Sequence, residues 1–280
     1  LMIQNLEETH WKSIKTDEIK KCIAACSGLY LEAVANESEA TPGSEIKVKC
    51  EIINRSNIQM QLAAVNSFPT TNTISPFQVI DLKNNIPQNL TFELTLPENS
   101  TYTEPYWLTN QQTLGMYQVN EQTKIGIPDI IRDVKVTFNI LIDGVIIPFE
   151  KTVVYKKNDD VKGEVYQPLD IVPVATSSIQ EKVYIFPNNK EKAVVVKIKA
   201  GKENISGSVK LDVPQNWIVS PSSIPFTLTK KGEEQLAVFN VIPSKEASEV
   251  TLKSIITIDG QTFDKEKIDI NYPHIYKQMV

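Results

Sequence analysis

Residues 134–155 read VKVTFNILIDGVIIPFEKTVVY, and their pattern is typical of a β-hairpin. Apolar residues alternate with polar ones as far as Ile142, Asp143-Gly144 follows, and a second run leads to Tyr155. Asp-Gly between two such runs is a strong hairpin signal, because both residues tolerate positive φ. The same arrangement returns at residues 250–272, VTLKSIITIDGQTFDKEKIDINY. We therefore expect two β domains, each closed by an Ile-Asp-Gly hairpin.

The spacing of the two hairpins predicts the domain organisation. Each hairpin closes a region of the usual size of a β-sandwich, and a chain of 280 residues suggests about two domains. The polar stretch Lys156–Gln167, followed by a proline, predicts the boundary. The predicted protein is mainly β: two tandem immunoglobulin-like β-sandwiches, residues 29–165 and 166–280, after a linker and one short helix within residues 1–28.

The remaining strands are predicted from alternating apolar and polar residues, seen most clearly where charged residues separate the apolar positions of 46–52. In the first domain, strands are expected at 29–35, 46–52, 59–65, 90–96 and 134–142. In the second, they are expected at 183–186, 193–199, 209–213, 217–219, 224–228, 235–241, 250–258 and 262–271. Trp217 lies in one of these runs and is expected in the core.

A helix is predicted over residues 16–27, because Ile19, Cys22 and Cys26 recur at helical spacing. Gly28 can end it in the left-handed conformation. The narrow apolar stripe must be covered by the sandwich or by another domain. Three cysteines make no disulfide framework, so we expect Cys22, Cys26 and Cys50 to be buried free thiols.

Composition and charge exclude several kinds of partner. The charged residues amount to 22% and the net charge is −5, which argues against nucleic acid and anionic membranes. Apolar runs are short, so no membrane insertion is expected.

The sequence contains no recognisable catalytic or metal-binding motif. Its only histidines, His10 and His274, lie at opposite ends, and neither a zinc motif nor a Gly-x-Ser-x-Gly elbow is present. The acidic run Asn158-Asp159-Asp160 lacks the spacing of a calcium loop, so it is expected to form an ordinary turn. We predict no catalytic, cofactor or metal site within this chain, and no enzyme activity of its own.

The alternating pattern lapses between Pro97 and Pro128, over a stretch too long for a plain hairpin loop. This stretch carries the four residues predicted to contact a ligand or another domain: Tyr102, Tyr106, Trp107 and Tyr117. Two alternatives are open. The rings form an exposed platform that stacks on a sugar, or they pack against the sandwich or a neighbouring domain.

Several short motifs resemble one protein family. They are Tyr106-Trp107-Leu108, Gly115–Val119, Gly126-Ile127-Pro128, Val154-Tyr155, Val161–Glu164, Tyr272–Ile275, and the helix end Ile23–Tyr30 followed by Glu32-Ala33. Together they resemble the region downstream of the catalytic domain in bacterial PIG-L/LmbE-like deacetylases, particularly those of Bacteroidetes. The resemblance covers nearly the whole chain. More weakly, Trp217–Pro221 with Phe226–Glu233 is similar to sandwich modules that accompany glycoside hydrolases.

The resemblance implies a zinc-dependent enzyme that removes N-acetyl groups from amino sugars, with the chemistry in an N-terminal α/β domain. The family's metal-binding Ala/Pro-His-x-Asp-Asp motif has no match here, so no catalytic residue is carried over. Zinc is expected only in that catalytic domain. This chain is then expected to be the C-terminal part of such an enzyme, which agrees with its opening Leu1-Met2.

Three functions follow for the chain itself. It is a non-catalytic accessory region that docks on or extends the catalytic domain, its expected partner. Alternatively, it is a carbohydrate-binding module that uses the loop aromatics, with a glycan as partner, or a structural spacer of a secreted or surface protein. All three imply a periplasmic or extracellular location.

Overall fold

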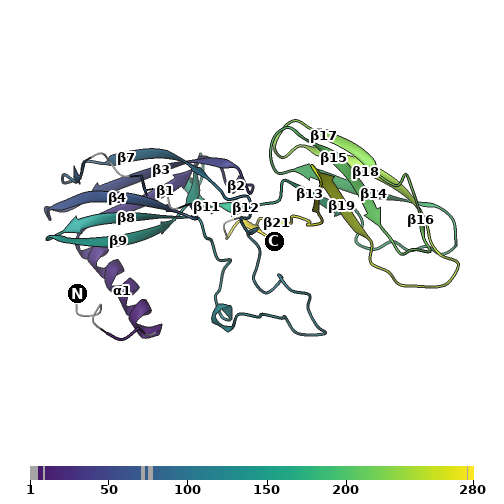
Figure 1. Cartoon of the computed structure of the whole chain (residues 1–280), viewed down its shortest axis with the longest axis horizontal. Helices are drawn as coiled ribbons and strands as arrows, with labels where there is room; N and C mark the ends of the chain where they lie inside the picture. Colours follow the sequence, from purple (N-terminus) through teal and green to yellow (C-terminus); the bar gives the residue numbers. More distant parts are fainter. Residues whose placement is uncertain (1–5, 9, 71–72, 75–77, 276) are drawn as a thin grey trace. The chain divides into compact units, whose positions relative to one another are not determined.

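The computed structural model describes residues 6–8, 10–70, 73–74, 78–275 and 277–280 (Figure 1). The predicted fold class is confirmed: the protein is mainly β, with one N-terminal α-helix and several small sheets that form sandwich-like domains. The opening Leu1-Met2 lies outside the described residues.

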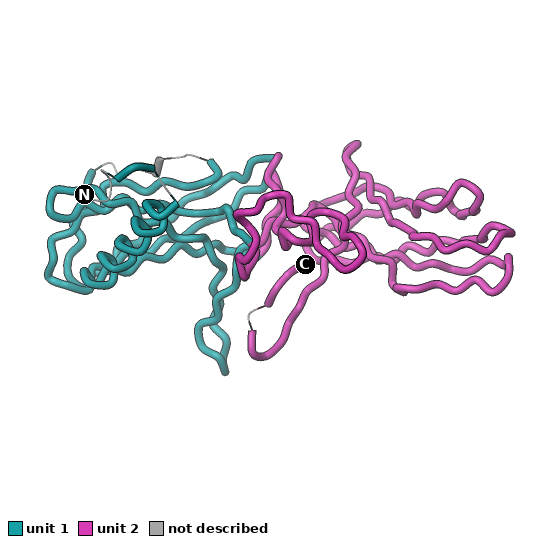
Figure 2. Tube along the Cα trace, turned by 90° about the horizontal axis from the view of Figure 1, so that it is seen from below, with its two compact units in different colours: residues 1–38, 43–98, 131–169 teal, residues 39–42, 99–130, 170–280 magenta. Residues whose placement is uncertain are grey.

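Two compact units make up the chain, coloured separately in Figure 2. Unit 1 comprises Leu1–Ser38, Gly43–Glu98 and Ile131–Leu169. Unit 2 comprises Glu39–Pro42, Asn99–Ile130 and Asp170–Val280. Neither unit is one continuous run of sequence, and the chain enters unit 2 for the last time after Leu169. The predicted division at residue 165 remains a prediction about which parts fold independently.

Unit 1 contains two five-stranded sheets. The first has the order β11-β10-β1-β3-β7, formed by Gly163–Pro168, Val154–Asp159, Leu29–Ala35, Glu45–Asn54 and Gln88–Thr95. The second has the order β5-β4-β8-β9, formed by Thr73–Ile74, Met60–Phe68, Lys135–Ile142 and Val145–Thr152, and β6, Ile80–Asp81, also pairs with β4.

The first Ile-Asp-Gly hairpin forms as the sequence predicts. Strands β8 and β9 pair as far as Ile142 opposite Val145, and the two turn residues, Asp143 and Gly144, have φ of 49° and 74°. Both angles are positive, as a type I′ turn requires. The alternate residues Val136, Phe138 and Ile140 are fully buried, so the strand buries one face in the core.

The stretch predicted as the boundary linker, Lys156–Gln167, forms strands instead. It makes most of the β10–β11 hairpin, and β10 pairs in parallel with β1, Val34 opposite Val154. Oδ1 of Asp159 accepts hydrogen bonds of 2.9 Å from the backbone N–H groups of Val161 and Lys162 and so stabilises the turn. The polar residues mark that hairpin turn, which is the turn chemistry expected for Asp159.

Helix α1, His10–Cys26, begins before the predicted residue 16. The predicted start was wrong: Thr16 lies inside the helix, where its hydroxyl donates to the Lys12 carbonyl at 2.7 Å. Gly28, with φ of 64°, follows the helix in the left-handed conformation, as predicted. The helices in the described part of the chain are too short or too polar to cross a membrane.

The prediction that all three cysteines are buried was wrong for two of them. Cys22 and Cys26 are exposed, because no residue of α1 is buried against the part of the chain that the structure describes. Cys50 is buried on the inward face of β3. Burial was expected from the general behaviour of free cysteine, but a helix face without a partner leaves its thiols in solvent.

Unit 2 contains two four-stranded sheets. One has the order β13-β14-β18-β16, formed by Ala175–Ile179, Lys192–Ala200, Glu234–Ile242 and Ile218–Ser220. The other has the order β17-β15-β19-β20, formed by Ile224–Leu228, Ile205–Asp212, Lys253–Ile258 and Gln261–Phe263. Two pairs of short strands complete the unit. Strand β2, Glu39–Ala40, pairs with β12, Asp170–Ile171, and β21, Asp269–Ile270, pairs with β22, Gln278–Met279.

The second Ile-Asp-Gly hairpin joins β19 to β20, and its turn residues Asp259 and Gly260 have φ of 50° and 79°. A separate glycine lets β15 approach β19 closely, since a Cβ on Gly207 would lie 2.3 Å from the Thr257 carbonyl oxygen. The strand predicted at Val183–Phe186 does not form. Its residues alternate as a strand would, but they pair with no neighbouring strand.

Candidate functional site

The four aromatic residues predicted as contacts all belong to unit 2. The loop that carries them is irregular apart from the short 3-10 helix η2, Gln122–Lys124. Beside Tyr102, Thr103 exchanges two hydrogen bonds of 2.9 Å with Ile171, and Glu104 pairs with Lys265 at 3.0 Å. These contacts fix the start of the loop, and burial raises the pKa of Tyr102.

Tyr106 and Trp107 lie in contact, with ring centroids 4.9 Å apart and an angle of 88° between the rings. Both are half-buried, and the Tyr106 hydroxyl donates to the Ile127 carbonyl at 3.2 Å. Tyr117 is 56% exposed. The Tyr106–Trp107 pair is therefore edge to face and does not form the coplanar platform on which a sugar ring stacks.

A second group of polar side chains surrounds Glu32 of β1, on the sheet of unit 1 that also contains β10 and β11. One carboxylate oxygen, Oε1, accepts from the hydroxyls of Tyr30, at 3.0 Å, and Tyr166, at 2.6 Å. The other, Oε2, pairs with Lys156 at 2.8 Å, and Lys156 also lies 3.6 Å from Glu164. These bonds join β1 to the β10–β11 hairpin.

The hydrogen bonds around Glu32 determine the ionisation of the group. Burial pushes the pKa of Glu32 upward, but the bonds from Lys156 and the two tyrosines outweigh it and lower the pKa. The same contacts raise the pKa of Lys156 and of Tyr166. Glu32, Tyr30, Lys156 and Tyr166 all have a partner within the cluster, so its arrangement is that of a structural connection between strands.

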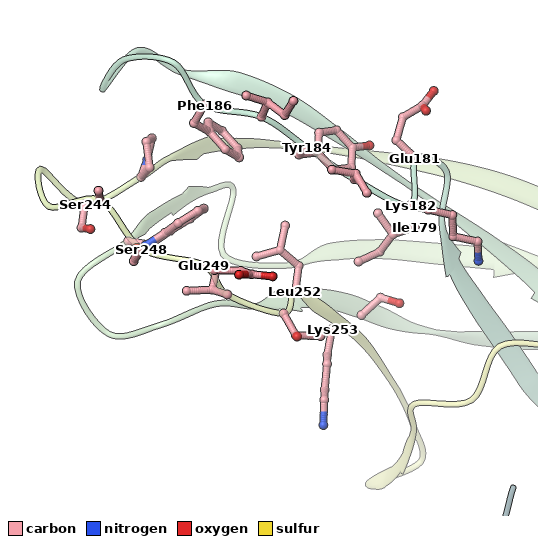
Figure 3. Close-up of a pocket in the computed structure, with 18 of the residues that line it drawn as sticks. Ile179, Glu181, Lys182, Tyr184, Phe186, Ser244, Ser248, Glu249, Leu252 and Lys253 are labelled. Carbon is pink, nitrogen blue, oxygen red and sulfur yellow. The ribbon is translucent and has the colours of Figure 1, made fainter. Parts of the chain in front are cut away.

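Unit 2 contains a cleft of about 1010 Å³ (Figure 3). One side is the segment after β13, with Tyr184 and Phe186, and the other is the loop before β19, with Glu249 and Leu252. Its apolar lining packs against the core of the sandwich. Sequence reasoning missed this cleft, because its two sides are far apart in the chain.

Trp217 also lines the cleft. It was predicted as a core residue and is half-buried against the core, with its ring 5.3 Å from that of Phe186 at an angle of 80°. Its indole Nε1 is buried and has no hydrogen-bond partner within the described residues. A buried N–H donor without an acceptor is rare in folded proteins.

The described residues contain no group of three or more His, Cys, Asp or Glu side chains placed to hold a metal ion. His10 contacts Trp11 edge to face, and His274 stacks on Tyr272.

No protein-family model matches the sequence, and no curated protein is significantly similar to it. Solved structures match it at low identity. Red sea bream transglutaminase matches 91% of this chain at 10% identity with a TM-score of 0.36, and a Salmonella alpha-2-macroglobulin mutant matches 90% at 8% identity with a TM-score of 0.28. The chain spans only 32% and 16% of the length of these two proteins.

A third match is a Porphyromonas gingivalis protein of unknown function, with a TM-score of 0.25 and 13% identity over 83% of this chain and 93% of that one. Similarity at this level bears on the fold alone. The sandwich-like fold is established by the strands and sheets of the chain itself.

Proposed function

We propose that this chain is the non-catalytic accessory region of a bacterial PIG-L/LmbE-like, zinc-dependent N-acetyl-sugar deacetylase. In this proposal, zinc and the catalytic residues belong to a separate N-terminal domain, and the enzyme works in the periplasm or outside the cell. The motifs around Tyr106, Gly126 and Tyr272 support the family. The observation that carries the docking role is the uncovered face of α1.

The uncovered face carries a stripe of apolar side chains, which we call the α1 stripe: Trp11, Ile19, Cys22 and Cys26. At 3.6 residues per turn, these positions fall within about 80° of the helix circumference, an arc that also holds Lys15, which pairs with Glu18 at 2.7 Å. Trp11 is 66% exposed, Ile19 is 45% exposed, and both cysteines are exposed. A helix of this length is marginal without tertiary packing, and exposed apolar stripes commonly mark interaction surfaces. The α1 stripe is where we place the contact with the catalytic domain.

The first test is the coding sequence upstream of Leu1. The proposal expects a His-x-Asp-Asp motif in an α/β domain there. A domain of another kind in that position would overturn the deacetylase assignment.

The second test compares hydrogen exchange of α1 in this chain and in the longer polypeptide. Docking predicts that the amides around Trp11 and Ile19 exchange more slowly when the catalytic domain is present. The variant Trp11→Ser with Ile19→Ser should abolish this protection, whereas Lys21→Ala, exposed on the same helix, should not. Equal exchange in the two proteins would contradict docking through the α1 stripe.

The other two roles have less support. The perpendicular rings of Tyr106 and Trp107 do not suit a carbohydrate platform. A spacer role leaves the α1 stripe without an explanation.

A further inference from the structure

The cleft of unit 2 has no part in the docking role proposed above, and its sides have the features of an incomplete β-sandwich. Strand β13 pairs with β14 only as far as Ile179 opposite Val196, with one further bond from the Gln180 N–H to the Val195 carbonyl. Beyond this point the chain leaves β14 and forms one wall of the cleft. The sheet therefore opens along the half of β14 that begins at Lys192.

The wall after β13 behaves like a strand without a partner. Val183 and Ile185 are 76% and 70% exposed, whereas Tyr184 and Phe186 pack against the core, which is the period-two pattern of extended chain. No backbone-to-backbone hydrogen bond holds these four residues to the rest of the described chain. A side chain makes one hydrogen bond to this backbone: Nζ of Lys192 donates to the Ile185 carbonyl at 3.2 Å. A row of unpaired N–H and C=O groups is a template for an added strand.

The opposite wall is the loop before β19, and Figure 3 shows Ser248, Glu249 and Leu252 across the cleft from Tyr184 and Phe186. Leu252 packs against the core, so the interior between the walls is apolar.

The charges around the cleft favour a basic occupant. Among the lining residues, five are acidic: Glu181, Glu246, Glu249, Asp264 and Glu266. Three are basic: Lys182, Lys245 and Lys253. One of the lysines, Lys182, is already bound to both carboxylate oxygens of Glu266, at 2.9 and 3.0 Å. An incoming Lys or Arg side chain therefore meets carboxylates in excess.

A sugar fits these features less well than a peptide does. The rings of Phe186 and Trp217 are near perpendicular, and the Lys192 ammonium lies over the rings of Tyr184 and Phe186, at 5.7 and 5.9 Å from their centroids. Stacking on a sugar needs an open, flat ring face. Unpaired backbone and an apolar interior are instead the requirements for adding an extended peptide to a sheet.

We propose that the cleft of unit 2 binds an extended segment of another protein as an added β-strand along Val183–Phe186. The peptide alternates apolar side chains, which enter between Tyr184 and Leu252, with Lys or Arg side chains that face Glu249.

The test begins with selection of a random peptide library, displayed on phage, against the intact chain. The expected result is enrichment of peptides in which apolar residues alternate with Lys or Arg. A synthetic peptide of the selected sequence is then titrated by calorimetry. In the nitrogen-15 NMR spectrum of the intact chain, the indole N–H signal of Trp217, assigned with Trp217→Phe, should move, and the amides of Val183–Phe186 should exchange more slowly.

Matched variants separate the cleft from the rest of the surface. Tyr184→Ala should weaken binding at least tenfold, whereas Leu236→Ala, exposed on β18 and outside the cleft, should leave the affinity unchanged. Glu249→Lys should weaken binding of the basic peptide about tenfold, whereas Glu203→Lys, exposed outside the cleft, should not. Thermal melting of each variant confirms that it is folded.

Three outcomes would overturn the proposal. The library enriches no peptide above background, a selected peptide binds Tyr184→Ala and Glu249→Lys as tightly as the unaltered chain, or the chain binds a glycan array through these residues and binds no peptide.

Discussion

The hydroxyl of Tyr166 donates a 2.6 Å hydrogen bond to Oε1 of Glu32, which lies 134 residues earlier in the chain. The same carboxylate pairs with Lys156, so one side chain of β1 connects with both strands of the β10–β11 hairpin. Short hydrogen bonds to an ionised acceptor are stronger than neutral ones. Glu32 is therefore the residue through which we expect the stability of unit 1 to depend on pH.

Replacing Glu32 with Gln should reduce the free energy of unfolding by about 1–2 kcal/mol at pH 7, because hydrogen bonds to a charged acceptor are lost. The folded pKa of Glu32 is lowered, so its contribution is present above the unfolded value of about 4.3 and is lost as the pH falls below it. Urea denaturation at pH 7, 5 and 3.5 should show that the difference in free energy of unfolding between the unaltered chain and Glu32→Gln shrinks as the pH falls. Glu93→Gln, exposed on β7 of the same sheet, is the control, and an equal loss there would contradict the prediction.

Replacing Tyr166 with Phe removes the donor and should destabilise unit 1 by about 1 kcal/mol. The bond to Glu32 raises the pKa of Tyr166, so this contribution is present below the ordinary tyrosine pKa of about 10 and is lost above it. In a double-mutant cycle with Glu32→Gln, the two losses should not add. Additive losses would mean that the two side chains stabilise the sheet independently.

The three cysteines should differ sharply in reactivity. Cys22 and Cys26 are exposed, whereas burial raises the pKa of Cys50 to about 12 and excludes reagents. With a thiol-reactive dye at pH 8, two thiols should react in the native protein and the third only after denaturation. The variant Cys50→Ala should lose only the thiol that reacts after denaturation. Rapid reaction of all three thiols in the native protein would show that Cys50 on β3 is not buried as described.

Gly144 and Gly207 should respond differently to substitution by alanine. Gly144 has positive φ and open space around it, so Gly144→Ala should cost about 1 kcal/mol through backbone strain alone. A Cβ on Gly207 meets the Thr257 carbonyl at 2.3 Å, so Gly207→Ala should cost about 2–3 kcal/mol by separating β15 from β19. Thermal melting of the two variants ranks their losses of stability. A larger loss for Gly144→Ala than for Gly207→Ala would refute the close approach of β15 to β19.

Local signals account for what the sequence predicted well. The alternation at Ile46–Ile52 predicted β3, the two Asp-Gly pairs predicted hairpins, and Gly28 predicted the end of α1. Each feature depends on residues within a few positions of each other. The fold class followed from their repetition.

Long-range pairing accounts for what the sequence could not show. Val183–Phe186 has the alternation of a strand but no partner strand, and partners are not encoded in the segment itself. The parallel partner of β1 is β10, which sequence reasoning assigned to a linker. The cleft joins residues near 184 with residues near 250, so its only local signal was the two aromatic residues of that segment.

The pairing of Glu32 with Lys156 also has a consequence for the order in which the protein is made. Lys156 follows Glu32 by 124 residues, and ribosomes add roughly 5–20 residues per second, so Glu32 waits roughly 6–25 s for this partner. During that time β1 has one edge that only β10 will cover. Strand β1 is thus a part of unit 1 whose pairing is completed late in translation.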